Sequence, residues 1–195
     1  PYVFSTGSIP LLSPTSKKDF IAIEGGSIKN GNNSMQTIVK YNSSGTQISY
    51  YSDLYLKSVG LIHDALINEE DELLLVGHQI EYDDGDTSCI VMINEDGSRK
   101  KSFNPSLPKN YRCLAGTFND EFIYAGGVIM NGYLGVGGFM VKLDKDGNKI
   151  LDFNLNVTSF NSSITNVDFI MPLSKNKILI SGSFDFCNGN RVLYN

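Results

Sequence analysis

The segment VKLDKDGNK (141–149) carries side chains of the types that bind calcium. Its carboxylates at Asp144 and Asp146 alternate as ligands do at the start of an EF-hand loop. An EF-hand loop also needs glycine at its sixth position and glutamate at its twelfth. Counting from Asp144, these positions hold Lys149 and Leu155. The segment instead fits a tight turn between two β-strands, in which its glycine takes a positive φ, so we expect a turn without a metal ion.

The acidic segment EYDDGDTS (81–88) is the best remaining candidate for a metal site. Hard cations such as Ca²⁺ favour clustered carboxylate oxygens, and this segment contains Glu81, Asp83, Asp84 and Asp86. The alternative is a solvated loop between two strands. The corresponding loops elsewhere in the chain have no such group of carboxylates, which excludes a metal site repeated along the chain. A single site in this loop stays open as the alternative, and we assign no metal.

Cysteine and histidine are too sparse to indicate a further site. Cys89, Cys113 and Cys187 form no CxxC pair, and their odd number argues against a disulfide framework. His63 and His78 are the only histidines, which argues against a zinc site. The chain also lacks GxSxG and HExxH motifs. We therefore expect structural thiols, no cofactor, no catalytic residues and no enzymatic activity.

Composition and charge exclude several classes of protein. The chain has 195 residues, enough for one domain with a substantial core, and its hydrophobic content of 41% is typical of globular proteins. Its formal net charge of −5 argues against nucleic acid as a partner, because phosphate binding needs a basic face. No apolar run is long enough to cross a bilayer, so we expect no membrane insertion.

An internal repeat sets the organisation of the whole chain. Three segments share an apolar run followed by a polar turn that ends in glycine: TIVKYNSSGTQI (37–48), CIVMINEDGSRK (89–100) and GFMVKLDKDGNK (138–149). Residues 191–195, RVLYN, begin the pattern a fourth time. The aligned positions are spaced 52, 50 and 51 residues apart and are occupied by Tyr41, Ile93, Leu143 and Tyr194.

A second repeated signature stays in phase with the first. It consists of an apolar run that ends in small residues: IAIEGGS (21–27), LLLVGHQ (73–79), FIYAGGV (122–128) and ILISGSF (178–184). An Asn-Gly or Asp-Gly pair follows each of them, and KKSFN (100–104) and KILDFN (149–154) follow the glycine turns. Repeats of this length indicate stacked units that share their hydrophobic cores.

Each unit is predicted to contain four short β-strands. In the second unit we expect them at residues 60–68, 72–78, 88–94 and 98–104. The two middle segments are almost continuously apolar, as expected for strands covered on both faces, whereas the outer segment is polar. Turns of changing charge join the first two strands of each unit, and we expect them to be solvated. Four-stranded antiparallel units repeating at about 50 residues predict an all-β fold of the β-propeller type.

The third and fourth units also resemble a known repeat family. The segments VKLDKDGNKILDFN (141–154) and KILISGSFDFCNGN (177–190) look like the delta-60 repeat of bacterial and phage β-propellers. The resemblance extends weakly over the first unit and departs most in the second, at His78 and at Asp84-Gly85. It implies a propeller fold and a surface or secreted setting, and it implies no catalytic residues.

We expect a single propeller over residues 1–195, with units at 5–53, 54–104, 105–154 and 155–195. Residues 1–4 are predicted to supply the outer strand that closes another blade. Two alternatives follow for PYVFS (1–5): it completes the fourth unit and closes a four-bladed ring, or it completes a blade of a larger ring from which this chain is an excerpt.

Recognition is predicted on the loops that join the second and third strands, because these loops vary most between units. Aromatic and polar side chains there suit contact with a protein or a glycan, and the candidates are Tyr82, Asp83, Asp84, Asp86, Tyr133, Phe186 and Asn188. We expect a non-catalytic interaction scaffold of a cell-surface, secreted or virion-associated protein. The alternatives are an assembly module of a larger complex such as a phage tail, and a propeller enzyme whose catalytic residues lie in other blades.

Overall fold

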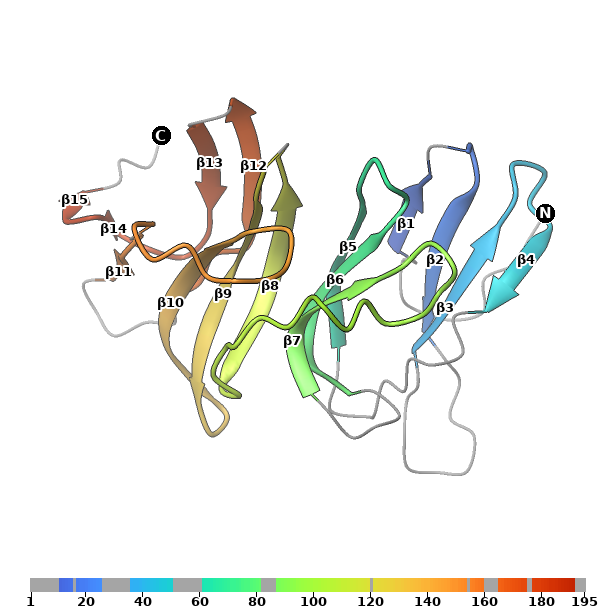
Figure 1. The fold of residues 1–195 in the computed structure, drawn as a ribbon. Coiled ribbons are helices and arrows are strands. Elements are labelled where there is room, and N and C mark those ends of the chain that lie inside the picture. The colour runs from blue at the N-terminus through green and yellow to red at the C-terminus, as the bar shows by residue number, and fades with distance from the viewer. Residues whose placement is uncertain are drawn as a thin grey trace.

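Antiparallel β-sheets make up the described part of the chain in the computed structural model (Figure 1). The structure describes residues 11–15, 17–25, 36–50, 61–81, 87–119, 121–153, 155–159, 165–174 and 177–191. Every strand pair within these ranges is antiparallel, which confirms the all-β prediction. The described residues include no helix that could span a membrane.

The first three sheets are meanders, in which each strand pairs with the next along the chain. The first sheet has the order β1 (Leu11–Pro14), β2 (Phe20–Gly25), β3 (Gln36–Tyr41) and β4 (Gln47–Tyr50). The second contains β5 (Leu61–Ile67), β6 (Leu73–Glu81) and β7 (Thr87–Ile93), and the third contains β8 (Tyr111–Phe118), β9 (Ile123–Asn131) and β10 (Leu134–Leu143). This recurrence of one meander follows the repeat in the sequence.

The fourth unit forms two smaller sheets. One pairs β12 (Phe169–Ser174) with β13 (Lys177–Ser181), and the other contains β11 (Val157–Thr158), β14 (Phe186–Cys187) and β15 (Asn190–Arg191). The first strands of the units contact one another in succession, β1 with β5, β5 with β8 and β8 with β12. The sheets therefore stand side by side (Figure 1), and within the described residues they do not close into a ring.

The expected outer strand is shorter than predicted in the second and third units. Instead of a strand over 98–104, the structure has a single bridge between Ile93 and Arg99, and the third unit has its counterpart between Leu143 and Lys149. After the bridge the chain turns, and the backbone N–H of Phe103 donates to the carbonyl of Lys100. Phe103 is thereby only 2% exposed, so burial of this aromatic side chain takes the place of further strand pairing.

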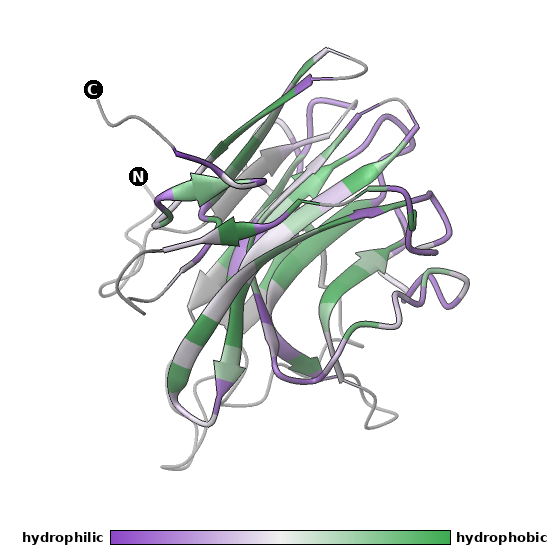
Figure 2. Cartoon of the chain, turned by 90° about the vertical axis from the view of Figure 1, so that its left-hand side faces the viewer, coloured by the Kyte–Doolittle hydropathy of each residue, from purple (hydrophilic) through white to green (hydrophobic). Residues whose placement is uncertain are grey.

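Among the described residues, three hydrophobic cores lie between consecutive units. Leu73 and Leu75 of β6 pack into the core shared with the first unit, whereas Leu74 and Val76 pack into the core shared with the third. Successive side chains of a strand point to opposite faces, so each middle strand serves two cores. Figure 2 shows the consequence, with apolar strands inside and hydrophilic residues at the turns. The prediction that the middle strands are covered on both faces is confirmed for β6, β7 and β9.

The glycine turns have the predicted geometry. Gly45, Gly97 and Gly147 have φ values of 80°, 87° and 86°, and each N–H donates to the carbonyl three residues earlier. At Asp144 the carboxylate accepts hydrogen bonds from the backbone N–H groups of Asp146 and Asn148 and from the Asn148 side chain. These hydrogen bonds lower the pKa of Asp144, and the bond from the Asn148 side chain has the largest effect. Its oxygens serve the turn, which confirms the turn over the EF-hand alternative.

Candidate functional site

The predicted recognition residues fall into separate places. Tyr82, Asp83, Asp84 and Asp86 lie outside the described residues. Tyr133 lies at the end of the β9–β10 hairpin, and Phe186 and Asn188 belong to the small sheet formed by β11, β14 and β15. Figures 1 and 2 show these two regions apart, so the structure does not join the three described candidates in one site.

The β9–β10 hairpin carries three exposed hydrophobic side chains, among them Tyr133, the most exposed large hydrophobic residue of the described part of the chain. Pairing between the two strands continues to Asn131 and Leu134, which leaves Gly132 and Tyr133 as the connection. Gly132 has a φ of 60°, a conformation that glycine adopts without strain. Tyr133 is 101% exposed, and Leu134 and Val136 are 72% and 60% exposed. The hairpin thus ends in an aromatic and two aliphatic side chains in solvent, which we call the apolar tip.

Phe186 and Asn188 have internal partners. The backbone N–H of Asn188 donates to the carbonyl of Asn156, and the side-chain oxygen of Asn188 accepts the backbone N–H of Asn156 at 2.9 Å. Asn188 has a φ of 49°, and its two bonds to Asn156 extend the pairing of β14 with β11. Phe186 is half-buried in β14. Both side chains therefore have structural roles, beside any contact that they make with a ligand.

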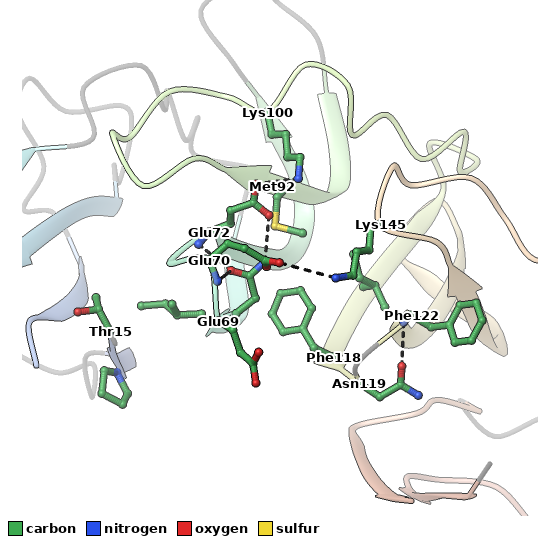
Figure 3. Close-up of a pocket in the computed structure, with 14 residues that line it drawn as sticks. Thr15, Glu69, Glu70, Glu72, Met92, Lys100, Phe118, Asn119, Phe122 and Lys145 are labelled. Carbon is green, nitrogen blue, oxygen red and sulfur yellow. Dashed lines mark hydrogen bonds and ion pairs between the residues drawn. The ribbon is translucent and has the colours of Figure 1, made fainter. Parts of the chain in front are cut away.

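A pocket of about 680 Å³ lies at the other end of the strands, beside the turns that join the first two strands of the first, second and third units (Figure 3). β9 begins at this pocket and ends at the apolar tip, so the two features occupy opposite edges of the sheets. The predicted recognition residues do not include any residue that lines this pocket. Apolar side chains from three units line the pocket: Pro14, Ile67, Met92, Phe118, Phe122 and Ile123.

Three polar side chains shape the turns beside the pocket. The side-chain oxygens of Thr15, Asn68 and Asn119 accept the backbone N–H of Asp19, Glu72 and Phe122, at 3.2, 2.8 and 2.8 Å. Each fixes the turn before the second strand of its unit, as Asn and Thr side chains do in Asx and ST turns. This feature was not recognised from the sequence, although an oxygen-bearing residue recurs four or five positions before each of these strands.

Charged side chains of the turns pair between neighbouring units. Glu70, in the first turn of the second unit, lies 3.7 Å from Lys145 in the glycine turn of the third. Lys17 pairs in the same way with Glu95, one unit earlier. In both pairs, the first turn of one unit carries the charge opposite to that of the glycine turn of the following unit. These four side chains are each more than 40% exposed, which confirms the prediction of solvated turns. The ion pairs between the turns were not predicted from the sequence.

The mouth of the pocket carries an excess of negative charge. Lys100 forms an ion pair with Glu72 at 2.7 Å, and Lys145 is near Glu70. Glu69 adds a third carboxylate to the lining, against two ammonium groups. An apolar floor with charged and polar groups at its rim is the usual form of a small-ligand site. This arrangement can hold a ligand by contact and hydrogen bonding.

Both histidines lie in a polar cluster between the second and third units. A Nη atom of Arg112 lies 3.4 Å from Nδ1 of His78, and His63 is the extra residue of a β-bulge in β5. Burial lowers the pKa of His63, and the charges of Arg112 and His78 lower it further. Nε2 of His63 and Nε of Arg112 are buried without a hydrogen-bond partner. We therefore expect His63 to be neutral in the folded protein near neutral pH.

Potential metal ligands do not gather in the described ranges. Among the residues that the structure describes, no three His, Cys, Asp or Glu side chains lie close enough together to hold a metal ion. The segment 82–86, which the sequence marked as the best metal candidate, is among the residues outside the description. No protein-family model matches the chain, and no curated protein is significantly similar to it in sequence.

Proposed function

We propose that the protein is a non-catalytic interaction scaffold of the β-propeller type that binds a protein partner through the apolar tip. A cell-surface, secreted or virion-associated setting is part of this proposal, and it rests on the resemblance of residues 141–154 and 177–190 to the delta-60 repeat. The propeller assignment draws support from the repeated meander and from the succession of first strands.

The exposed apolar tip carries the proposal. Tyrosine offers a large, rigid surface with a polar hydroxyl, and such residues dominate the binding energy of many protein interfaces. Tyr133, Leu134 and Val136 contribute little to the folded chain, because each is at least 60% exposed. Their exposure has a cost in hydrophobic free energy, which a partner that covers them removes. Backbone pairing of β9 with β10 continues to Asn131 and Leu134, so the strands that carry the tip are ordered before a partner binds, which lowers the entropic cost of binding.

Site-specific photocrosslinking tests this function. A photoreactive phenylalanine analogue replaces Tyr133 in one variant and Leu151 in another. Leu151 is 86% exposed and follows the bridge between Leu143 and Lys149, at the end of β10 opposite the tip. Each variant is irradiated with material from the native source, and adducts are identified by mass spectrometry. We expect one defined partner at position 133, absent at 151 and displaced by unlabelled wild-type protein but not by Tyr133→Ala. Equal adducts at both positions, or none at 133, would refute tip-mediated binding.

The pocket favours a second candidate function, which is binding of the terminal sugar of a glycan. Its lining combines the aromatic face of Phe118 with the carboxylate of Glu69, and such faces stack on sugars while carboxylates accept their hydroxyl groups. A glycan array with the wild-type protein, Glu69→Ala and Asp152→Ala tests it. Asp152 is an exposed carboxylate outside the pocket. Binding that Glu69→Ala abolishes and Asp152→Ala retains supports this function, and equal binding by all three proteins refutes it.

A further inference from the structure

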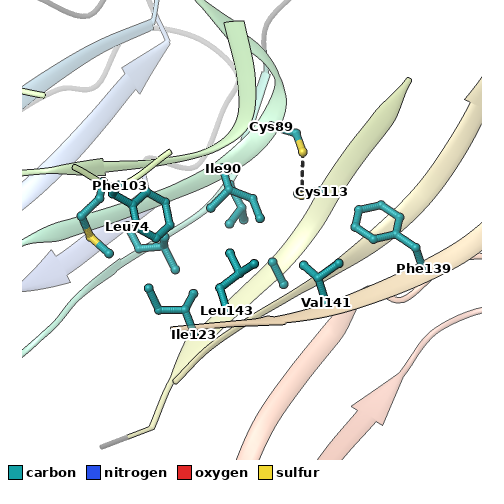
Figure 4. Close-up of a cluster of buried hydrophobic side chains, with 12 residues drawn as sticks. Leu74, Cys89, Ile90, Phe103, Cys113, Ile123, Phe139, Val141 and Leu143 are labelled. Carbon is teal, nitrogen blue, oxygen red and sulfur yellow. Dashed lines mark hydrogen bonds between the residues drawn. The ribbon is translucent and has the colours of Figure 1, made fainter. Parts of the chain in front are cut away.

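Two of the three cysteines meet in the core between the second and third units. The Sγ atoms of Cys89 in β7 and Cys113 in β8 are 3.1 Å apart (Figure 4). The side chains are 5% and 0% exposed, and both belong to the hydrophobic cluster that joins the two sheets. The third cysteine, Cys187, lies in a different cluster, between the third and fourth units.

The fold brings these two residues together across a boundary between units. β7 and β8 belong to different sheets and contact each other, and the cysteines are 24 residues apart in the chain. A β-bulge lies beside Cys113 in the pairing of β8 with β9, and bulges redirect neighbouring side chains. The sulfurs need to approach by only about 1 Å to reach the bond length of a disulfide.

We propose that Cys89 and Cys113 are a covalent modification site, in which oxidation forms a disulfide that joins the second unit to the third. The two thiols release two protons and two electrons as the sulfur–sulfur bond forms. A low-molecular-weight disulfide such as oxidised glutathione accepts the electrons, through a mixed disulfide, and leaves as two thiols. Secreted and surface proteins meet oxidants of this class.

The bond forms during folding, before the two sheets close over the sulfurs. In the folded protein neither thiol is open to a solvent-borne disulfide, since both are buried. Burial also raises the pKa of Cys113 well above its usual value, which removes the reactive thiolate. The folded reduced protein therefore resists oxidation, whereas a chain that folds in the presence of the oxidant acquires the cross-link. Once formed, the disulfide shares this protection and persists against reductants.

Oxidative refolding of the full chain tests the proposal. The reduced, unfolded protein is refolded in a buffer of reduced and oxidised glutathione, and free thiols are counted after denaturation. We expect one free thiol in the wild-type protein, assigned to Cys187 by peptide mapping, and a loss of two mass units. The Cys187→Ala variant should have no free thiol after oxidative refolding. Its denaturation midpoint should be higher in the oxidised form than in the reduced form. Cys89→Ala and Cys113→Ala should each keep both remaining thiols.

Other results overturn the proposal. Three free thiols after oxidative refolding of a folded wild-type protein would show that the pair does not react. A disulfide that includes Cys187 would show that proximity in the fold does not select the pair. The wild-type peptide map decides the question even where one of the single variants fails to fold, because it identifies the bonded residues directly.

Discussion

The shared cores make a quantitative prediction for one pair of leucines. Leu74 of β6 faces the third unit and is 0% exposed. Leu179 of β13 lies between Ile178 and Ile180, which pack toward the third unit, so its own side chain points to the opposite face and is 45% exposed. The same substitution at these positions, Leu74→Ala and Leu179→Ala, therefore compares a covered face of a unit with an open one.

The expected losses of unfolding free energy at the two positions differ by a factor of about three. Complete burial makes Leu74→Ala cost the transfer free energy of the lost atoms plus that of the cavity left behind, about 3 kcal/mol in total. At Leu179 roughly half of the side chain is already in water and solvent fills the space, so we expect about 1 kcal/mol. For a chain of 195 residues, 3 kcal/mol lowers the melting temperature by about 8 °C.

Urea unfolding followed by far-UV circular dichroism and tyrosine fluorescence measures both losses. The chain has 10 tyrosines and no tryptophan, so the fluorescence reports on several units at once. The slope of the free energy against urea must stay the same in both variants for the midpoints to be compared. Equal losses at the two positions would refute the reasoning, because they would show that the outer face of β13 is as well covered as the face of β6.

Three further predictions concern backbone approach, charge and pH. Gly127→Ala should destabilise the protein by about 3 kcal/mol in urea unfolding, because its Cβ would overlap a carbonyl of β8, while Gly137→Ala, with no contact closer than 3.9 Å, should cost less than about 1 kcal/mol. Lys145→Glu should cost less than about 1 kcal/mol, and Glu70→Lys in the same chain should restore it; a double variant no more stable than Lys145→Glu would contradict the pairing between units. The pKa of His63 lies below 6.5 in the folded state, so below that pH the unfolded state binds the proton first and stability falls as pH decreases toward the folded pKa. His63→Gln should flatten this decline in chemical unfolding measured from pH 7 to 5, and an unchanged slope would contradict the assignment.

The repeat made the sheets predictable, because apolar periodicity and turn glycines are local signals. β6 was expected at 72–78 and begins at Leu73, and Gly97 has the positive φ that its turn requires. The outer strand was not predictable in its length. Whether residues 98–104 continue to pair or turn to bury Phe103 depends on the space that the next unit leaves, and local sequence does not encode that space.

The candidate site was only partly accessible from the sequence. Tyr133 was singled out because the loops between second and third strands vary, and the structure places it in solvent at a hairpin end. The pocket was missed because its lining comes from three units, among them Thr15, Ile67 and Phe118, which are far apart in the chain. The contact of Cys89 with Cys113 was missed for the same reason, since spacing alone does not show which strands of neighbouring units face each other.

Because each middle strand contributes side chains to two cores, the strand also determines how many units a substitution or deletion destabilises. Leu73 and Leu74 are adjacent in sequence, yet they stabilise interfaces with different neighbours. A substitution in one core therefore destabilises the two units that border that core. It affects a third unit only if it changes the conformation of a strand that two cores share. Deleting one residue within β6 would exchange the side chains of both cores at once, whereas a unit inserted whole would leave every existing register intact. The chain can thus change its length by complete units far more readily than by single residues.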